Sequence, residues 1–271
     1  MRESPGRTRG TGRSGRITDA GWFVMVASFQ FPKGMDIGMG TGANGVWQYW
    51  RPFSSDIVEL GVVCGQDVSL PVHFHEEDQL TFVLSGRRRF LMKDSLFDVA
   101  PGQGVRIPAG TPHRSLSESM DILCINIYTA PGVYDAAGLF AGMSLLLRQG
   151  SIDWLDLAAI IEDHRCDGGM PRERTEARNG SWETVSEGAR LAGMSREGFS
   201  RRFRKQFGIP PQIFRLSERL NEARHLLRVG QPVAAVAAET GFSDQSHLGR
   251  CFRRAFGVTP GHYRRSVSHA P

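Results

Sequence analysis

Cysteine is scarce in this sequence, and long apolar runs are missing from it. The 271 residues include four scattered cysteines and no Cys-x-x-Cys pair. This pattern excludes a disulfide framework and indicates reduced thiols. No apolar run approaches the roughly 18 residues that span a membrane, and the apolar stretch 21–29 lacks the cleavage pattern of a signal peptide. We therefore expect a cytoplasmic protein with no membrane partner.

The net charge of +5 is distributed unevenly along the chain. Residues 181–271 carry 15 Lys and Arg against 7 Asp and Glu, whereas residues 21–180 carry 13 against 19. A basic C-terminal part beside an acidic N-terminal part favours a DNA-binding unit joined to a unit that does not touch DNA. The length of the chain also predicts two domains.

The basic part contains a repeat. The segments 185–195 and 233–243 each place a small residue four positions before a glycine, followed by a serine and a basic segment. After each segment an apolar stripe recurs at helical spacing: Phe199, Phe203 and Phe207, then Leu248, Phe252 and Phe256. We interpret the repeat as two helix–turn–helix units. The glycines supply a positive φ in each turn, and Ser195 and Ser243 are the expected N-caps of the second helices.

A long helix is expected between the two copies. Pro210 and Pro211 open it, and Gly230 and Pro232 end it. About 18 residues at 1.5 Å each span roughly 27 Å. A rigid helix of this length holds two recognition helices about one DNA turn apart, near 34 Å with their own width included. One chain can then contact two successive major grooves of double-stranded DNA.

Residues 181–265 resemble the DNA-binding domain of AraC/XylS-type transcription regulators, including the closing segment 241–264. The resemblance implies sequence-specific DNA binding, with RNA polymerase as a further partner. We expect an activator, although the sequence leaves activation and repression both open. Gly188 departs from the pattern and is expected to weaken its helix by about 1 kcal/mol. The expected DNA-binding residues are Arg196, Glu197, Ser200, Arg201, Arg204, Gln245, Ser246, His247, Arg250 and Arg253.

A basic helix face is also typical of simple solvation, so each arginine has two interpretations. Arg201 and Arg250 occupy equivalent positions in the repeat. Each can donate two hydrogen bonds to guanine in the major groove, or each can hold only a phosphate. The duplication favours contacts with DNA.

Short strands separated by Gly, Pro, Ser or Asp are expected from Trp47 to Tyr128. Such a series indicates an antiparallel sandwich or barrel. It contains His73-x-His75-x3-Gln79-x6-Gly86 and then Gly102-x5-Pro108-x-Gly110-x2-His113, which resemble the two cupin motifs. The expected fold class is α+β: an N-terminal cupin-like antiparallel β-barrel, then an all-α domain of two helix–turn–helix units joined by a long helix.

The cupin-like motifs supply the candidate effector site: His73, His75, Gln79 and His113. His73 and His75 are two residues apart, so on a strand they face the same side. Three imidazoles and an oxygen suit Zn, Ni, Fe or Mn. Enzymatic cupins, however, carry Glu where this chain has Gln79, which weakens a metal site.

Two interpretations of this site stay open: a polar pocket without a cofactor, or a divalent metal held by His73, His75 and His113. Trp47, Tyr49 and Trp50 either line the pocket or belong to the core.

The expected organisation has five parts. These are a disordered basic extension (1–20), a cupin-like sensor domain (21–132), a helical pair that packs on the barrel or forms a homodimer (133–165), a linker (166–180) and the tandem helix–turn–helix domain (181–271). We interpret the chain as an AraC-type transcription regulator, not an enzyme, controlled by a small-molecule effector in the barrel. One alternative is a metal-dependent cupin enzyme with a DNA-binding tail, and another is a regulator whose barrel only dimerises.

Overall fold

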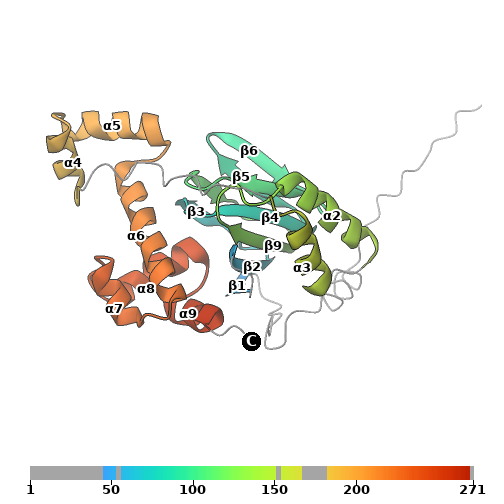
Figure 1. Cartoon of the computed structure of the whole chain (residues 1–271). Coiled ribbons are helices and arrows are strands. Elements are labelled where there is room, and N and C mark those ends of the chain that lie inside the picture. Colours follow the sequence, from blue (N-terminus) through green and yellow to red (C-terminus); the bar gives the residue numbers. More distant parts are fainter. Residues whose placement is uncertain (1–44, 53–55, 151–153, 167–181, 269–271) are drawn as a thin grey trace, which may run out of the picture.

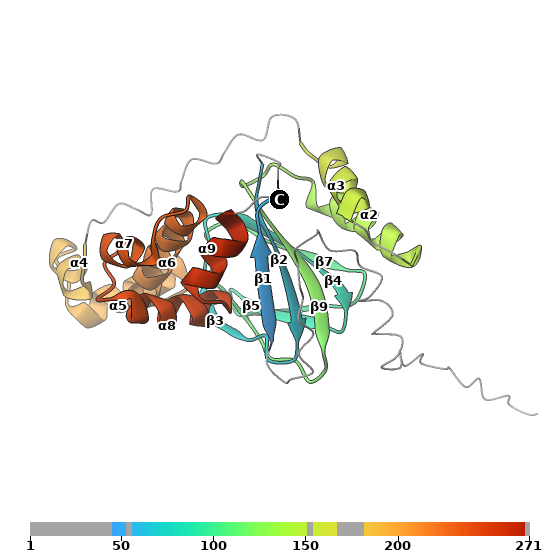
Figure 2. The same cartoon turned by 90° about the horizontal axis from the view of Figure 1, so that it is seen from below.

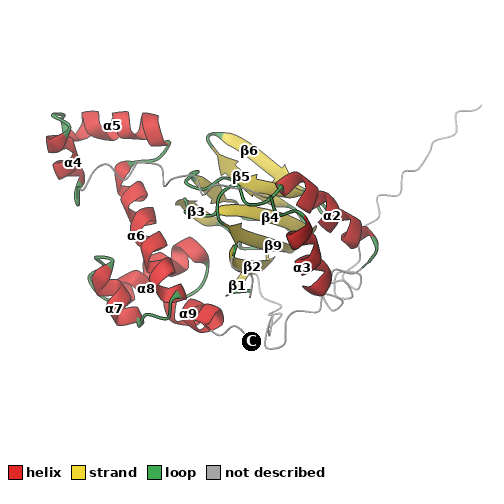
Figure 3. Ribbon diagram, viewed as in Figure 1, coloured by secondary structure: helices red, strands yellow, loops and turns green. Residues whose placement is uncertain are grey.

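The computed structural model describes residues 45–52, 56–150, 154–166 and 182–268 (Figure 1). The expected basic extension and nearly all of the expected linker lie outside these residues. Strands fill the part of the chain up to Thr129, and helices follow it (Figure 3). No described helix is long and apolar enough to cross a membrane.

The strands form two antiparallel sheets. One has the order β1 (Val46–Trp50), β2 (Ile57–Gly65), β9 (Ile122–Thr129), β4 (Asp78–Ser85) and β7 (Gly104–Ile107). The other has the order β3 (Leu70–His73), β8 (His113–Ser115), β5 (Arg88–Met92) and β6 (Ser95–Val99). Within the described residues no strand pairing joins the two sheets. The α+β fold class is confirmed, with the cupin-like part in the form of an open two-sheet arrangement.

The five-stranded sheet is buried on both faces, and every residue of β4 and β9 is buried. Helices α2 (Ala136–Arg148) and α3 (Trp154–Asp163) cover one face (Figures 1 and 2). Leu139 and Met143 of α2 and Ile161 of α3 share an apolar cluster with the strands. Burial on both faces explains why β9 is almost continuously apolar in sequence instead of alternating, whereas β4 also buries the polar residues Asp78, Gln79, Thr81 and Ser85. The helical pair therefore packs on the sheet, which was one of the two expectations for it.

The C-terminal half contains two helix–turn–helix units. They are α4 (Val185–Leu191) with α5 (Arg196–Phe207), and α7 (Val233–Glu239) with α8 (Gln245–Phe256), followed by α9 (Pro260–Ser268). Helix α6 (Pro211–Arg228) joins them and has 18 residues. In Figure 1, α6 is a rod with α4 and α5 at one end and α7, α8 and α9 at the other.

The turns follow the chemistry expected from the repeat, with one exception. Gly193 and Gly241 have φ values of +62° and +73°, which favour glycine. Ser195 caps α5. The expectation for Ser243 is wrong: Asp244 caps α8 and accepts a 2.7 Å hydrogen bond from the His247 N–H. The spacing of the repeat rises from 48 to 49 residues across this turn, which moves the capping position one residue along the chain.

Gly188 has a packing role that the sequence pattern did not reveal. A Cβ at this position would lie 2.8 Å from Phe199 and 3.0 Å from Trp182. The aromatic side chains of the first unit therefore approach the α4 backbone closely. This contact accounts for a glycine inside a helix, despite its low helix propensity.

The two halves of the molecule share one core. Trp47, Tyr49 and Tyr128 of the sheet belong to the same apolar cluster as Phe256 and Tyr263 of the helical half. Figure 2 shows α9 beside β1, with α8 close to β3. The second helix–turn–helix unit is therefore docked on the sensor half, by which we mean the described residues up to 166; the helical, or DNA-binding, half comprises residues 182–268.

Candidate functional site

The three histidines of the cupin-like motifs lie together in the interior. His73 ends β3 and is paired in register with His113, which begins β8. Their ring centroids are 4.5 Å apart, and the His75 ring lies 4.9 Å from His113. His75 lies beyond the end of β3, so strand alternation is not what brings it to the same side as His73. A turn between β3 and β4 does so instead.

Each ring is oriented by its backbone. The Nδ1 atoms of His73, His75 and His113 lie 2.8–2.9 Å from the carbonyl oxygens of Pro71, Glu77 and Thr111. A neutral imidazole that donates from Nδ1 leaves Nε2 without a proton. All three rings therefore keep an unprotonated Nε2 that can accept a hydrogen bond or bind a metal.

The three histidines are held neutral. Burial, followed by the charge of His75, lowers the pKa of His73 to about 3. Burial is also the main cause that lowers the pKa of His75 and, well below its usual value, that of His113. Neutral rings are the form that accepts hydrogen bonds or binds a metal.

Gln79 on β4 completes the cluster. Its Oε1 lies 2.8 Å from His75 Nε2, and its Nε2 donates to Thr81 and Asn126. With His75 protonated on Nδ1, the two facing atoms are both acceptors. The contact is satisfied if the Gln79 amide turns its NH2 group toward His75, since amide orientation is an assignment. Alternatively, His75 Nε2 and Gln79 Oε1 both coordinate a cation, which removes the conflict between two acceptors.

The donor set fits a divalent metal chemically, with one deficiency. The candidate nitrogens of His73, His75 and His113 lie within 4.8 Å of one another. Two nitrogens that share a zinc ion at 2.0–2.1 Å are at most about 4 Å apart, so the rings would move slightly closer. The fourth donor is a neutral amide instead of a carboxylate, which reduces the attraction for a cation.

The expected DNA-binding residues are spread over the two second helices. On α5, Arg196, Glu197, Arg201 and Arg204 are exposed, and on α8, Gln245, Ser246, Arg250 and Arg253 are exposed. Ser200 and His247 are half-buried. The His247 ring packs edge-on against Phe242, 5.3 Å away between centroids, and its Nδ1 lies 3.1 Å from Ser243 Oγ. This arrangement leaves His247 less free to reach a base than its neighbours.

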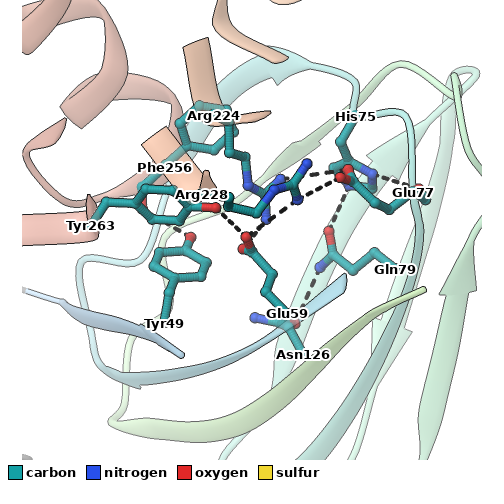
Figure 4. A network of polar contacts seen from close by, with 10 residues as sticks. All are labelled: Tyr49, Glu59, His75, Glu77, Gln79, Asn126, Arg224, Arg228, Phe256 and Tyr263. Carbon is teal, nitrogen blue, oxygen red and sulfur yellow. Dashed lines mark hydrogen bonds and ion pairs between the residues drawn. The ribbon is translucent and has the colours of Figure 1, made fainter. Parts of the chain in front are cut away.

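A polar network, missed by the sequence patterns, crosses from the sensor half to the helical half (Figure 4). The fully buried Glu59 on β2 accepts hydrogen bonds from Arg224 on α6 and Tyr263 on α9. Arg228 donates to Glu77 at 2.7 Å. Burial alone would raise the pKa of Glu77, but the charges of Arg228 and Arg224 outweigh it and hold the pKa at about 2.

Two features of the sequence could have revealed this network. Glu59 is a lone acid within the apolar run 57–63. Arg224 follows Leu220 by four residues, which places its charge on the apolar face of α6. A charge on an apolar face predicts a buried partner, although the sequence does not say which one.

Two family models match the chain: a cupin domain over residues 63–126 and a helix-turn-helix domain over residues 189–266. The probable transcriptional regulator LumQ of Photobacterium leiognathi is 26% identical over 232 residues, covering 73% of this chain and 93% of LumQ. The HTH-type transcriptional activator RhaS of Escherichia coli O139:H28 is 33% identical over 132 residues. The cupin domain and the helix-turn-helix domain are the two domains of an AraC-type transcription regulator.

The match to RhaS covers 45% of this chain and 42% of RhaS, so the chain spans less than half of that relative. Among solved structures, unsaturated fatty acid-bound ToxT of Vibrio cholerae covers 84% of this chain and 97% of its own, at 9% identity and a TM-score of 0.44. The two family models give the chain a helix-turn-helix DNA-binding half and a cupin-like half, and both sequence relatives are named as regulators of transcription.

Proposed function

We propose that this regulator binds a small organic effector in the pocket of His73, His75, Gln79 and His113. The observation that carries the proposal is the convergence of these four buried polar side chains on one space. Three unprotonated imidazole nitrogens would accept hydrogen bonds from hydroxyl or amine groups of an effector. Such a few well-placed polar groups among aromatic walls are typical of small-molecule sites.

We propose further that α5 and α8 carry the DNA contacts, with Arg201 and Gln245 reaching base edges and the remaining exposed residues positioning the phosphates. Arg201 and Arg250 occupy equivalent places in the two units, and both are exposed. Arginine is the side chain best suited to guanine in the major groove.

The experiment that tests the effector site uses the full chain. The preferred DNA sequence is first selected from a random pool, and compounds are then screened for those that change its affinity. A compound that acts through the pocket should lose its effect in His75→Ala and keep it in His262→Ala, which removes an exposed histidine of α9. Equal responses of the two variants would place the effector elsewhere.

The same proposal treats the protein as a regulator and not as a cupin enzyme, because Gln79 replaces the carboxylate that the enzymatic motif carries. RNA polymerase and a second copy of the chain are proposed as partners. For the second copy, α2 and α3 offer Leu145 and Leu155, whose exposed fractions are 53% and 78%. Sedimentation of Leu155→Glu against the parent chain tests this surface, and identical oligomeric states would remove it as a dimer interface.

A further inference from the structure

The pocket of the four polar side chains is closed by the DNA-binding half. Arg224 of α6 and Ala255 and Phe256 of α8 form part of its wall. The Phe256 ring lies 6.4 Å from that of His73, and the Phe256 carbonyl accepts a 2.9 Å hydrogen bond from Tyr49. The enclosed space is about 10 Å³, which holds roughly one water molecule. Organic ligands occupy pockets of about 300 Å³ or more, so none fits while α6 and α8 are docked.

The docked state is held by a latch, which we define as Glu59, Glu77, Arg224, Arg228 and Tyr263. Its hydrogen bonds and ion pairs connect Glu59 and Glu77 of the sensor half to Arg224, Arg228 and Tyr263 of the helical half (Figure 4). The Arg224 guanidinium also lies 4.4 Å from the centre of the Tyr128 ring and 4.9 Å from that of Phe256. Arg224 therefore joins the latch and the pocket wall in one side chain.

The chemistry of the latch suits an interface that opens. Buried ion pairs gain attraction but lose hydration, so their net contribution to stability is small. When the halves separate, water hydrates all four charges again. The Nε and Nη1 atoms of Arg224 have no hydrogen-bond acceptor among the described residues, and opening would also supply them with water. The latch thus fixes one docked geometry without making it irreversible.

In the docked state the sensor half also lies beside the surface of α5 and α8 that we expect to bind DNA. Arg201 of α5 and Arg250 of α8 line a groove of about 1980 Å³. Asp67 and Asp94 of the sensor half lie on its other wall together with Lys93 and Arg114. Residues 21–180 carry 19 acidic against 13 basic side chains, so this half repels DNA phosphates through its net charge and not through the wall itself. Docking therefore places an acidic body next to the path of the duplex.

We propose that Arg224 and Phe256 are the gate of the effector pocket, so that docking of the DNA-binding half and binding of an organic effector exclude each other. Effector binding displaces α6 and α8 from the sensor, releases the latch and raises the affinity for DNA. This inference rests on the proposed effector site.

The test compares Glu59→Gln with Asp98→Asn in the full chain. Asp98 forms an exposed 3.3 Å ion pair with Arg87, so its variant makes the same chemical change outside the latch. Glu59→Gln should raise amide hydrogen exchange in α9 and β1 by roughly tenfold or more, the factor that each 1.4 kcal/mol of lost docking free energy produces. The remaining strands should exchange as in the parent chain.

The gate itself is tested with diethyl pyrocarbonate, which modifies accessible neutral imidazoles. His73 and His113 should be protected in the parent chain and in Asp98→Asn, and modified in Glu59→Gln. The exposed His225 and His262 react equally in all three proteins and calibrate the dose. Pocket histidines that stay protected after the latch is broken would overturn the gate.

The DNA readout uses a duplex of mixed sequence at fixed low salt, followed by fluorescence anisotropy. Glu59→Gln should bind several-fold more tightly than the parent chain, and Asp98→Asn should match the parent. Increased exchange with unchanged DNA affinity would overturn the regulatory link. If no protein binds DNA but exchange still rises in α9 and β1, the proposed DNA contacts fail while the latch is supported.

A second variant keeps the test decisive if Glu59→Gln does not fold. Arg228→Gln removes the 2.7 Å contact with Glu77 at the edge of the latch, where the Arg228 side chain is 11% exposed, and we expect the same changes at smaller amplitude. Exchange, imidazole modification and DNA affinity that all match the parent chain in this variant would overturn the proposal. Exchange that rises uniformly through every strand would also overturn it, because the two halves would then not separate as units.

Discussion

At the scale of single residues, the character of the pocket depends on Gln79. The neighbouring nitrogens are neutral, oriented and within 4.8 Å of one another, so only the amide separates this cluster from a stronger metal site. A neutral oxygen attracts a divalent cation less than a carboxylate does.

Gln79→Glu should therefore increase the affinity for Zn²⁺ or Mn²⁺, by about tenfold or more if the carboxylate gains at least 1.4 kcal/mol of attraction. Calorimetric titration of the metal into the full chain measures the change. Gln103→Glu adds the same charge at an exposed position and serves as control. Equal metal affinities for the two variants would mean that Gln79 does not face a cation.

The histidines also predict how stability depends on pH. The unfolded chain protonates them near pH 6.5, whereas burial keeps His73 neutral in the folded chain down to about pH 3. Because the folded pKa is depressed, the stabilising contribution is complete above pH 6.5 and is lost as the pH falls toward 3. In metal-free protein, the titration of His73 lowers the free energy of unfolding by at most about 1.4 kcal/mol per pH unit in this window. His75 and His113, whose pKa values are also lowered, add to the loss at acidic pH.

Urea unfolding at a series of pH values measures this slope. His113→Gln should make the slope shallower, because the burial that lowers the pKa of His113 no longer affects a titratable group. His262→Gln, at an exposed position, should leave the slope unchanged. A slope that is the same in all three proteins would contradict the prediction.

Arg201 is the residue we expect to contact a base in the first groove. Arg201→Ala should cost roughly 1–3 kcal/mol on the selected DNA site and relax the preference at one base pair. Arg202→Ala removes an exposed arginine next to it that does not line the groove, and its loss should be smaller and equal for all sequences. Competition binding with single-base variants of the site distinguishes the two. If Arg201→Ala weakens binding equally on all DNA sequences, Arg201 contacts only a phosphate. The same test applies to Arg250.

At the scale of secondary-structure elements, the two helix–turn–helix units are unequal copies. The apolar stripe of α8 is completely buried, because the sensor half and α9 cover it, whereas Phe199 and Phe207 of α5 are only half-buried. The apolar stripe of the first unit is covered mainly by aromatic residues of that unit. The Trp182 ring packs edge-on against the rings of Phe199 and Phe203, with 5.5 and 5.8 Å between ring centroids. The first unit therefore relies more on its local contacts.

The caps of the two recognition helices provide a matched pair of variants. Ser195 Oγ accepts from the Gly198 N–H at 3.1 Å, so Ser195→Ala should lower the free energy of unfolding by about 1 kcal/mol. Ser243 occupies the equivalent place, but its hydroxyl bonds to Asp244 and the cap is supplied by Asp244. Ser243→Ala should therefore cost much less. Thermal or urea unfolding compares them, and equal losses would contradict the assignment of the second cap.

At the scale of the whole molecule, the uneven charge governs binding to DNA. The excess of basic residues after position 180 should make binding depend steeply on salt, because each arginine–phosphate contact releases counterions. The logarithm of the binding constant should fall with the logarithm of salt concentration with a slope near −0.9 per contact. Anisotropy measurements from low to physiological salt test this, with added sucrose as an osmotic control. A constant affinity would count against DNA as the partner.

Local patterns in the sequence were sufficient for the helices of the repeat and for both families of motif. Helical spacing located the 18-residue α6, and the glycines at 193 and 241 located the turns, because these features depend on neighbouring residues alone. The grouping of His73, His75 and His113 also followed from motif spacing. Strands such as β6, whose residues are mostly exposed, carry little apolar pattern and were not expected individually.

The pairing of Glu59 with Arg224 was decided only by the tertiary structure. The two residues are 165 positions apart, and no periodicity relates a strand of the sensor to a helix of the DNA-binding half. The sequence determined that each half has apolar faces to bury and that one half is basic. Which surfaces of the halves meet depends on shape and charge across the whole fold, and that meeting is what closes the histidine pocket with Arg224 and Phe256.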